Sequence, residues 1–334
     1  MRVFEIQQFG IENLKLVDRE TPKPGLYEVL VRLSAASLNY RDLMVAEGQY
    51  NPKLPFPMVP LSDGVGIVEA AGPQVTRVKT GDRVAGAFMQ TWIDGGPDRE
   101  KAASALGGSI DGVLSEYRIF HEQGLVNVPA HLSDEEAATL PCTGVTAWHA
   151  LFEGETAKTG DTVLIQGTGG VATFALQFAK AAGLRPIVIS SSDQKLERAR
   201  QLGAAEGINY SEEPDWGRAV AKLVPGGVDY VIELGGAKTV PHSLNAVRMG
   251  GMIAMIGALS GAEASVSPVP ILMRSIRVQG IYVGSRIMFE RMNRAIVLHK
   301  IKPIVDRVFP WLDVKAAMKY MQEQKHVGKV CLKF

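Results

Sequence analysis

The sequence is poor in the residues that form disulfide frameworks and membrane segments. Its 334 residues include only two cysteines, Cys142 and Cys331, and two thiols so far apart in sequence provide no disulfide framework. Their scarcity favours a reducing compartment, the cytoplasm. No apolar run approaches the roughly 18 residues of a membrane helix, and the first residues are typical of a strand rather than of a signal peptide.

An excess of charge of either sign is also absent. The formal net charge is +1, which gives no electrostatic reason to expect nucleic acid or an acidic partner. The six histidines are scattered without the spacing of metal ligands. The hydrophobic content of 46% is ample for buried cores, and the length favours two domains. We therefore expect a protein that binds a small molecule, with no nucleic-acid or membrane partner.

The most informative pattern lies at residues 161–189. An apolar run from Val163 to Ile165 is followed by closely spaced glycines, by apolar residues at helical spacing and by a second β run. This order is typical of a strand–turn–helix–strand unit. Glycines let the backbone approach a ligand closely, and N–H groups at the start of a helix attract a pyrophosphate. The pattern predicts a dinucleotide-binding turn made by Gly167, Thr168, Gly169, Gly170 and Val171.

The residues after the second β run favour NADP over NAD. An NAD site usually carries Asp or Glu here, because a carboxylate binds the 2′-hydroxyl of the ribose. In this chain the run ends in Ser190 and Ser191, and Lys195 follows where it could pair with a 2′-phosphate. The alternatives are that Lys195 is a solvated residue of the next helix and that Asp193 caps this helix.

The rest of the chain separates into a β-rich first part and an α/β middle. Residues 1 to about 120 carry alternating apolar segments, typical of strands with one exposed face. One short helix is expected over residues 39–47. Farther on, continuous apolar runs alternate with helical segments, and such runs predict a parallel sheet that is covered on both faces.

Several short motifs give a specific resemblance when they are taken in order. They are Ser37–Asp42, Val59–Gly66, Gly81–Val84, Gly112–Tyr117, Pro141–Ala147, the glycine turn and Gly328–Val330. Their order and spacing resemble the medium-chain dehydrogenase/reductase superfamily, which contains alcohol dehydrogenases and quinone oxidoreductases. The resemblance implies an α/β protein with a GroES-like β catalytic domain at residues 1–125 and a doubly wound, parallel-sheet Rossmann domain at residues 126–266. Residues 267–334 would return to complete the Rossmann sheet edge and the catalytic domain, and an edge strand at 277–284 would form a homodimer.

The chain departs from the zinc-dependent members of this superfamily at the metal positions. Asn39 stands where they have cysteine, and Ser62 and Asp63 stand where they have histidine and glutamate. A catalytic zinc site needs three Cys, His or carboxylate ligands, and only Asp63 is of such a type. No cysteine lies between residues 1 and 141, so a four-cysteine structural site there is impossible. We therefore predict no metal.

The resemblance also implies coenzyme contacts outside the glycine turn. Thr146 is expected near the nicotinamide and Tyr210 near the adenosine phosphate, although ordinary partial burial is an alternative for Tyr210. Arg286 either binds phosphates or is a solvated residue at the start of a helix. The residues expected at the nicotinamide end are Gly257, Ala258, Leu259, Ile281, Tyr282 and Val283.

The expected chemistry is hydride transfer by a nicotinamide coenzyme, with the protein supplying binding and electrostatics. Without zinc to polarise a ketone, quinones and α,β-unsaturated carbonyls are favoured as substrates because they are already electrophilic. Asn39 either holds a substrate carbonyl or caps the helix that follows it. Tyr50 matches a proton-donating tyrosine of similar enoyl-thioester reductases, and Tyr40 could bind the nicotinamide ribose. For either tyrosine the alternative is an amphipathic ring at a cleft edge.

Other polar and aromatic residues nearby have alternative roles. Asp42 and Asp63 could be structural, each bonding local backbone, and Cys142 could be a small buried residue. Trp92 lies in an expected polar loop over residues 89–109, where it either lines the substrate pocket or lies on the surface. These observations together predict an NADPH-dependent, zinc-independent reductase of quinones or enones. The alternatives are a zinc-free alcohol or aldehyde dehydrogenase and a non-catalytic NADPH-binding protein.

Overall fold

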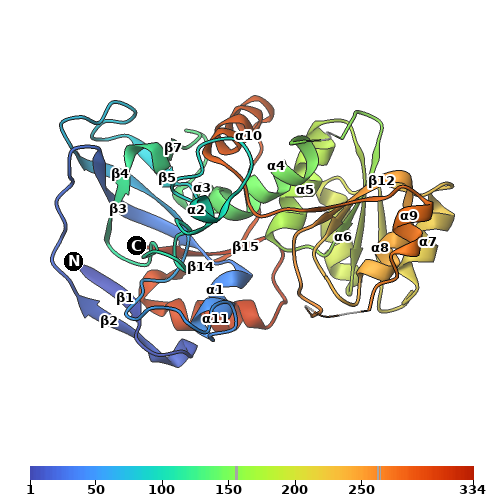
Figure 1. The fold of residues 1–334 in the computed structure, drawn as a ribbon, viewed down its shortest axis with the longest axis horizontal. Helices are drawn as coiled ribbons and strands as arrows, with labels where there is room; N and C mark the ends of the chain where they lie inside the picture. Colours follow the sequence, from blue (N-terminus) through green and yellow to red (C-terminus); the bar gives the residue numbers. More distant parts are fainter. Residues whose placement is uncertain (155–156, 262, 264) are drawn as a thin grey trace. The chain divides into compact units, whose positions relative to one another are not determined.

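Two large sheets, each with its own hydrophobic core, organise the chain in the computed structural model. The structure describes residues 1–154, 157–261, 263 and 265–334. Unit 1 consists of Met1–Val145 together with Val283–Phe334, and unit 2 consists of Thr146–Tyr282. Figure 1 shows blue and red segments within one unit, since the first and last parts of the chain share unit 1.

Unit 1 is built on a seven-stranded, mostly antiparallel sheet with the order β14-β15-β3-β4-β5-β7, and β6 pairs with β3. A hairpin of β1 (Arg2–Ile6) and β2 (Leu14–Asp18) lies beside it. The sheet strands are β3 (Glu28–Ser37), β4 (Asp63–Ala71), β5 (Arg83–Gly86), β6 (Tyr117–His121), β7 (Leu125–Asn127), β14 (Val305–Pro310) and β15 (Lys329–Lys333). The helices are α1 (Tyr40–Ala46), α2 (Arg99–Ala102), α3 (Asp134–Ala138), α10 (Arg286–His299) and α11 (Val314–Gln322).

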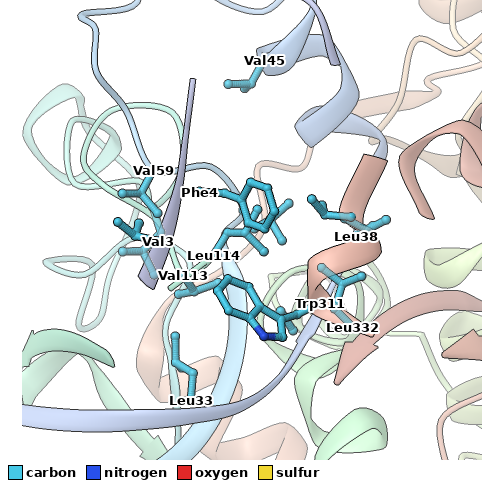
Figure 2. Close-up of a cluster of buried hydrophobic side chains, with 14 of the residues drawn as sticks. Val3, Phe4, Leu33, Leu38, Val45, Val59, Val113, Leu114, Trp311 and Leu332 are labelled. Atoms are coloured by element: carbon cyan, nitrogen blue, oxygen red, sulfur yellow. The ribbon is translucent and has the colours of Figure 1, made fainter. Parts of the chain in front are cut away.

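The core of unit 1 joins segments from both ends of the sequence. Figure 2 shows Phe4 and Trp311 close together, and their rings meet edge to face with centroids 5.5 Å apart. Leu38, at the end of β3, is buried in the same cluster. Because burying a leucine side chain is worth about 1.5–3 kcal/mol, Leu38 anchors the residue that follows it, Asn39.

Unit 2 has a six-stranded parallel sheet with the order β10-β9-β8-β11-β12-β13. When β8 is counted as the first strand, this is the 3-2-1-4-5-6 order of a dinucleotide-binding Rossmann fold. All five residues of β8 are buried, so both faces of the sheet are covered there. The strands are β8 (Thr162–Gln166), β9 (Arg185–Ser190), β10 (Glu206–Asn209), β11 (Val228–Glu233), β12 (Val247–Met255) and β13 (Arg277–Gly280).

Helices connect the strands of unit 2, as a parallel sheet requires. The pairs α5–α6 and α7–α8 each pack together (Figure 1). The described helices are α4 (Val145–Phe152), α5 (Gly170–Ala181), α6 (Asp193–Leu202), α7 (Trp216–Leu223), α8 (Val240–Ala246) and α9 (Val269–Met273). The predicted α/β class, with a β-rich unit and a doubly wound parallel sheet, is therefore confirmed.

The first unit extends to Val145, beyond the expected boundary at residue 125, while residues 267–334 divide between the Rossmann sheet edge and unit 1 in the way that was expected of this return. Residues 126–145 lie in unit 1, because β7 pairs with β5 and α3 packs on β3. Residues 267–282 lie in unit 2, because β13 pairs with β12 along the sheet edge. Val278 on β13 is 43% exposed, and the pairing of this edge with a second copy remains a prediction.

The segment at residues 89–109 is less polar than expected. Trp92 is wholly buried, and its indole Nε1 donates a hydrogen bond to Gly95 O at 2.8 Å, so a position on the surface is wrong. The segment also contains α2, whose N-cap residue Asp98 accepts a hydrogen bond from the Lys101 backbone. Among the described residues, no helix combines the length and the apolar character needed to cross a bilayer.

Candidate active site

Asn39 is fixed in unit 1 at the junction between β3 and α1. It is the N-cap residue of α1, and its backbone N–H donates to Asp42 Oδ2 at 2.7 Å. The side chain of Asn39 is only 6% exposed. Asn39 therefore caps α1, as the alternative prediction stated, and Asp42 has the structural role predicted for it. The side-chain amide of Asn39 also forms hydrogen bonds to residues outside α1.

The amide of Asn39 belongs to a buried hydrogen-bonded group that we call the Asn39 cluster: Asn39, Ser62, Asp63 and Lys329. Asn39 Nδ2 donates to Ser62 Oγ at 3.3 Å, and Ser62 Oγ donates to Asp63 Oδ1 at 2.6 Å. Lys329 Nζ donates to Asn39 Oδ1 and to Leu38 O. Ser62 and Asp63 are fully buried and Lys329 is 3% exposed. The sequence placed Asn39 and Asp63 at this site but did not predict Lys329.

Burial and neighbouring charges shift the pKa values of two buried carboxyl groups in unit 1. Burial raises the pKa of the Asp63 carboxyl, while the Lys329 ammonium and the Ser62 hydroxyl oppose this. Asp63 Oδ2 also accepts a hydrogen bond from Cys142 N at 3.1 Å. Burial raises the pKa of Asp42 to about 6, against the opposing charge of Arg41. The local-backbone role predicted for Asp42 is therefore correct, whereas Asp63 bonds the Ser62 side chain and the backbone of the distant residue Cys142 and also faces a cation.

The two cysteines are not arranged as nucleophiles. Cys142 is half-buried, and burial together with the Asp63 carboxylate raises the pKa of its thiol well above its usual range. Cys331 is buried on β15, where its Sγ donates to Glu135 O at 3.4 Å and burial raises its pKa to about 12. Since the thiolate is the reactive form, neither residue is suited to covalent catalysis.

Tyr40 and Tyr50 lie at the surface, with exposed fractions of 41% and 38%. The Arg41 guanidinium lies over the Tyr50 ring at 4.9 Å and over the Phe88 ring at 4.7 Å, and Arg41 Nη1 donates to Leu106 O at 2.8 Å. Arg41 therefore holds the Tyr50 ring, a role that the sequence did not predict. Their proton-donor and ribose-binding roles remain predictions.

In unit 2 the glycine turn has the shape that a phosphate ligand needs. Gly167 has φ 75°, a conformation that glycine adopts at little cost, and Gly169 precedes the 12-residue helix α5, which starts at Gly170. A Cβ atom built on Gly167 or Gly169 would meet no atom within 4 Å. At Gly257, by contrast, a Cβ would lie 2.4 Å from Leu234 O. The open space over the turn therefore suits a pyrophosphate, and the residues present fit a dinucleotide.

The ends of β9 and β10 form a second part of this surface. Ser190 O accepts a hydrogen bond from Tyr210 N at 3.0 Å, and Ser191 is exposed beside it. The cap of α6 is Ser192 rather than Asp193, because Ser192 Oγ accepts from Lys195 N at 3.5 Å. The Asp193 carboxylate instead accepts from Asn209 Nδ2 at 3.0 Å. Ser190, Ser191, Lys195 and Tyr210, which is 41% exposed, thus surround the end of β9.

The residues expected at the nicotinamide end follow β12 and β13 or begin α4. Thr146 and Ile281 are buried, whereas Leu259 and Tyr282 are 50% and 39% exposed. Gly257 and Ala258 precede Leu259 in the same loop. Val283 has φ 54°, a strained conformation for a β-branched residue. Thr146, Gly257–Leu259, Ile281 and Tyr282 belong to unit 2, and Val283 belongs to unit 1.

Arg286 lies in unit 1 as the first residue of α10. Its Nη1 donates to Gln123 O at 3.3 Å and also to the Gln123 side chain, and its Nε lies 3.4 Å from Glu290 Oε1. Arg286 is only 7% exposed. The solvated alternative is therefore wrong, while phosphate binding by Arg286 stays a prediction.

A second buried polar network, not predicted from the sequence, lies at the ends of β8 and β11. Glu233 Oε1 accepts hydrogen bonds from Gly235 N at 2.8 Å, Gly236 N at 2.9 Å and Thr239 Oγ1 at 2.6 Å. Glu233 Oε2 accepts from Gln166 Nε2 at 2.6 Å and from Ser243 Oγ. Glu233 is fully buried. The one sequence signal was an acidic residue that ends an apolar run and precedes two glycines.

Comparison with known proteins agrees with this arrangement of two units. The family model for the alcohol dehydrogenase GroES-like domain matches residues 24–130, and the model described as zinc-binding dehydrogenase matches residues 170–298. A zinc-type alcohol dehydrogenase-like protein of Schizosaccharomyces pombe is 46% identical over 97% of this chain and 96% of its own length. The chain belongs to the medium-chain dehydrogenase/reductase superfamily. It is accordingly an NAD(P)-dependent oxidoreductase, as the resemblance implied.

Two solved structures similar to this chain differ in their nicotinamide coenzyme, which is NAD for one protein and NADP for the other. An NAD-dependent alcohol dehydrogenase is 34% identical, with a TM-score of 0.91 and coverage of 100% of both chains. A 2-octenoyl-CoA carboxylase reductase, solved in complex with NADP and 2-octenoyl-CoA, is 28% identical with a TM-score of 0.85, covering 97% of this chain and 82% of its own. A nicotinamide coenzyme is therefore supported for this oxidoreductase.

The zinc implied by the family-model description does not suit the residues of the Asn39 cluster. Amide and hydroxyl groups replace the cysteine and histidine ligands that zinc prefers, and an ammonium already donates to Asn39 Oδ1. Within the part of the chain that the structure describes, no three His, Cys, Asp or Glu side chains are grouped so that they could hold a metal ion.

Proposed function

We propose that this oxidoreductase is an NADPH-dependent reductase that transfers hydride to an α,β-unsaturated carbonyl or a quinone without zinc. The observation that carries the proposal is the Asn39 cluster, which occupies the metal-ligand positions of the superfamily with a hydrogen-bond donor in place of a Lewis acid. Such a donor stabilises negative charge on a carbonyl oxygen. It suits substrates that are electrophilic before they bind.

The residues of the two units have different parts in this reaction. When bound, NADPH supplies a hydride to the β-carbon of the enone; a proton reaches the α-carbon, and the products are the saturated carbonyl compound and NADP⁺. The turn from Gly167 to Val171 holds the pyrophosphate, and Asn39 Nδ2 donates to the substrate carbonyl. Tyr50 is the candidate source of the proton, and Tyr40 is the candidate partner of the nicotinamide ribose.

The preference for NADPH rests on the end of β9. Serines stand where a carboxylate would bind the ribose 2′-hydroxyl, and the nearest acidic group, Asp193, is bonded to Asn209 Nδ2. Lys195 and Tyr210 lie at the same place, where an ammonium and a phenol suit a 2′-phosphate. The superfamily member solved with NADP supports this choice, while the NAD-dependent member makes it worth testing.

The Ser190→Asp variant is expected to shift the preference from NADPH toward NADH. A new carboxylate would repel the 2′-phosphate and accept a hydrogen bond from the 2′-hydroxyl, and the ratio of kcat/KM for NADPH to that for NADH should fall about 100-fold, equivalent to about 2.7 kcal/mol. Steady-state kinetics with both coenzymes measure this ratio. Lys158→Asp, a charge change elsewhere in unit 2, serves as the control. An unchanged ratio in Ser190→Asp would contradict the assignment of the phosphate site.

A substrate panel tests the proposed reaction. Oxidation of NADPH is followed by its absorbance with 2-cyclohexenone and 1,4-benzoquinone, and reduction of NADP⁺ is followed with simple primary and secondary alcohols. We expect turnover with the first pair and none with the alcohols. Because relatives are named as alcohol dehydrogenases, alcohol oxidation is the second candidate function. Activity with alcohols alone would establish this second function. Coenzyme binding without any turnover would instead indicate a non-catalytic protein.

A further inference from the structure

Gln166 and Glu233 are the last residues of two neighbouring strands, β8 and β11. The strand order of the sheet reverses between these strands, because β9 lies beyond β8 on one side and β12 lies beyond β11 on the other. In open α/β sheets, ligands bind outside the carboxyl ends of the strands at this point. Both side chains are buried, and they lie at the edge of the sheet where a coenzyme is expected.

The side-chain amide of Gln166 has each of its hydrogen-bonding groups in use. Its Oε1 accepts from Leu234 N and Gly235 N, each at 3.0 Å. Its Nε2 donates to Glu233 Oε2 at 2.6 Å and to Ser243 Oγ at 2.9 Å. Because two backbone N–H groups face Oε1, the NH₂ group must point to the carboxylate. The residue that immediately precedes the glycine turn is therefore tied to the chain that follows β11.

The chain that follows β11 in turn holds the chain that follows β12. We call Leu234–Gly236 the β11 loop and Gly257–Gly261 the β12 loop. Gly235 O accepts hydrogen bonds from Ser260 N at 2.7 Å and from Ser260 Oγ at 2.8 Å. The two loops also pack closely, since a Cβ atom on Gly236 would lie 2.7 Å from the backbone of the β12 loop. A shift of the β11 loop would therefore move the β12 loop with it.

We propose that Glu233 and Gln166 are positioning residues that fix the β12 loop, and with it the nicotinamide ring, relative to the glycine turn. The inference rests on the proposed function, in which the β12 loop lies at the nicotinamide end of the coenzyme. Glu233 orients the β11 loop through Gly235 N and Gly236 N, and Gln166 joins this loop to the strand that leads into the turn. Hydride transfer requires the ring to face the substrate, and a displacement of about 1 Å can cost about 100-fold in rate.

Exchanging the two side chains gives a sharp test, because the exchange restores a donor opposite each acceptor. In Glu233→Gln alone, the new NH₂ group faces the NH₂ group of Gln166, so two donors meet. In Gln166→Glu alone, two carboxylates meet. In the double variant the carboxylate stands at position 166, where it accepts from Leu234 N, Gly235 N and the new amide. The amide oxygen at position 233 still accepts from Gly236 N.

The binding of two ligands to the full-length protein measures the effect. Each single variant should bind NADPH about tenfold more weakly than wild type, and its kcat with 2-cyclohexenone should fall about 100-fold. The Kd for 2′-phospho-ADP-ribose, which is the coenzyme without its nicotinamide, should stay within about twofold of wild type. The double variant should recover NADPH affinity to within about fivefold. Isothermal titration calorimetry gives both Kd values.

Asp229→Asn is the matched control. Asp229 lies near the start of β11, and its Oδ2 accepts from Thr162 N, at the start of β8, at 2.7 Å. The control makes the same acid-to-amide change and alters a bond between the same two strands, but at their opposite ends. Both Kd values and kcat should match wild type. Losses equal to those of Glu233→Gln would show a general effect of weakening the sheet and would overturn the inference.

The two Kd values separate the remaining results. Equal weakening of both ligands, single variants that match wild type, or a double variant no better than the singles would each overturn the inference. If wild type reduces neither 2-cyclohexenone nor 1,4-benzoquinone, the proposed reaction fails instead, and the Kd values still test the positioning role. If neither single variant folds, Thr239→Val decides, because it removes one donor to Glu233 Oε1 and keeps the shape of the side chain. Weaker binding of NADPH alone supports the inference, and unchanged binding overturns it.

Discussion

The Gly169→Val variant is expected to bind NADPH about 100-fold more weakly than wild type while its free energy of unfolding changes by no more than about 1 kcal/mol. The small change in stability follows from the backbone: φ at Gly169 is −75°, and a Cβ there would meet no protein atom within 4 Å. The large change in affinity follows because the same space is where the pyrophosphate approaches the start of α5. Fluorescence titration with NADPH measures the Kd, and thermal unfolding without coenzyme measures the stability.

A matched control for this variant is Gly96→Val. A Cβ on Gly96 would also meet nothing within 4 Å, and Gly96 is outside the residues with positive φ. It belongs to unit 1 and is remote in sequence from the glycine turn, so its NADPH affinity should equal that of wild type. Normal NADPH binding by Gly169→Val would show that the ligand does not use the turn.

The Glu233→Ala variant is expected to lose about 4 kcal/mol of stability, the largest effect on folding among our predictions. Glu233 is fully buried and accepts hydrogen bonds from two backbone N–H groups, two hydroxyls and one amide. Alanine leaves these donors without their acceptor, each at a cost of about 1–3 kcal/mol before the structure relaxes, and adds a cavity. Urea unfolding monitored by circular dichroism measures the loss.

Glu206→Ala provides the comparison for Glu233→Ala. Glu206 begins β10 in the same sheet, but its ion pair with Arg185 spans 3.7 Å and both side chains are more than 40% exposed. Exposed pairs of this kind contribute about 0–1 kcal/mol, so the unfolding midpoint should hardly change. A Glu233→Ala protein as stable as Glu206→Ala would contradict the role of the buried network.

The features that the sequence predicted are those encoded by residues close to one another along the chain. The turn at Gly167–Gly170 and the strands on either side of it lie within about 30 residues. The inner parallel strands β8, β9, β11 and β12 followed from apolar runs in the sequence. Asn39 and Asp63 were placed together through motifs of the superfamily, not through any local pattern.

The features that the sequence did not predict depend on contacts between distant residues. Lys329 meets Asn39 across 290 positions, and nothing in the motif Gly328–Val330 shows that its lysine is buried. The burial of Trp92 likewise depends on the packing of unit 1. Gln166 and Glu233 are 67 positions apart in sequence and form a hydrogen bond at the ends of adjacent strands. This bond could not be predicted without knowing the order of the strands in the sheet.

The division of unit 1 along the chain has a consequence for how the protein is made. Residues 146–282 leave the ribosome before β15, whose strand completes the sheet beside β3 and carries Lys329. Domains generally fold as units during synthesis, so the Rossmann sheet can form while the Asn39 cluster still lacks its cation. The part of the chain proposed to hold the nucleotide can therefore fold before the Asn39 cluster is complete.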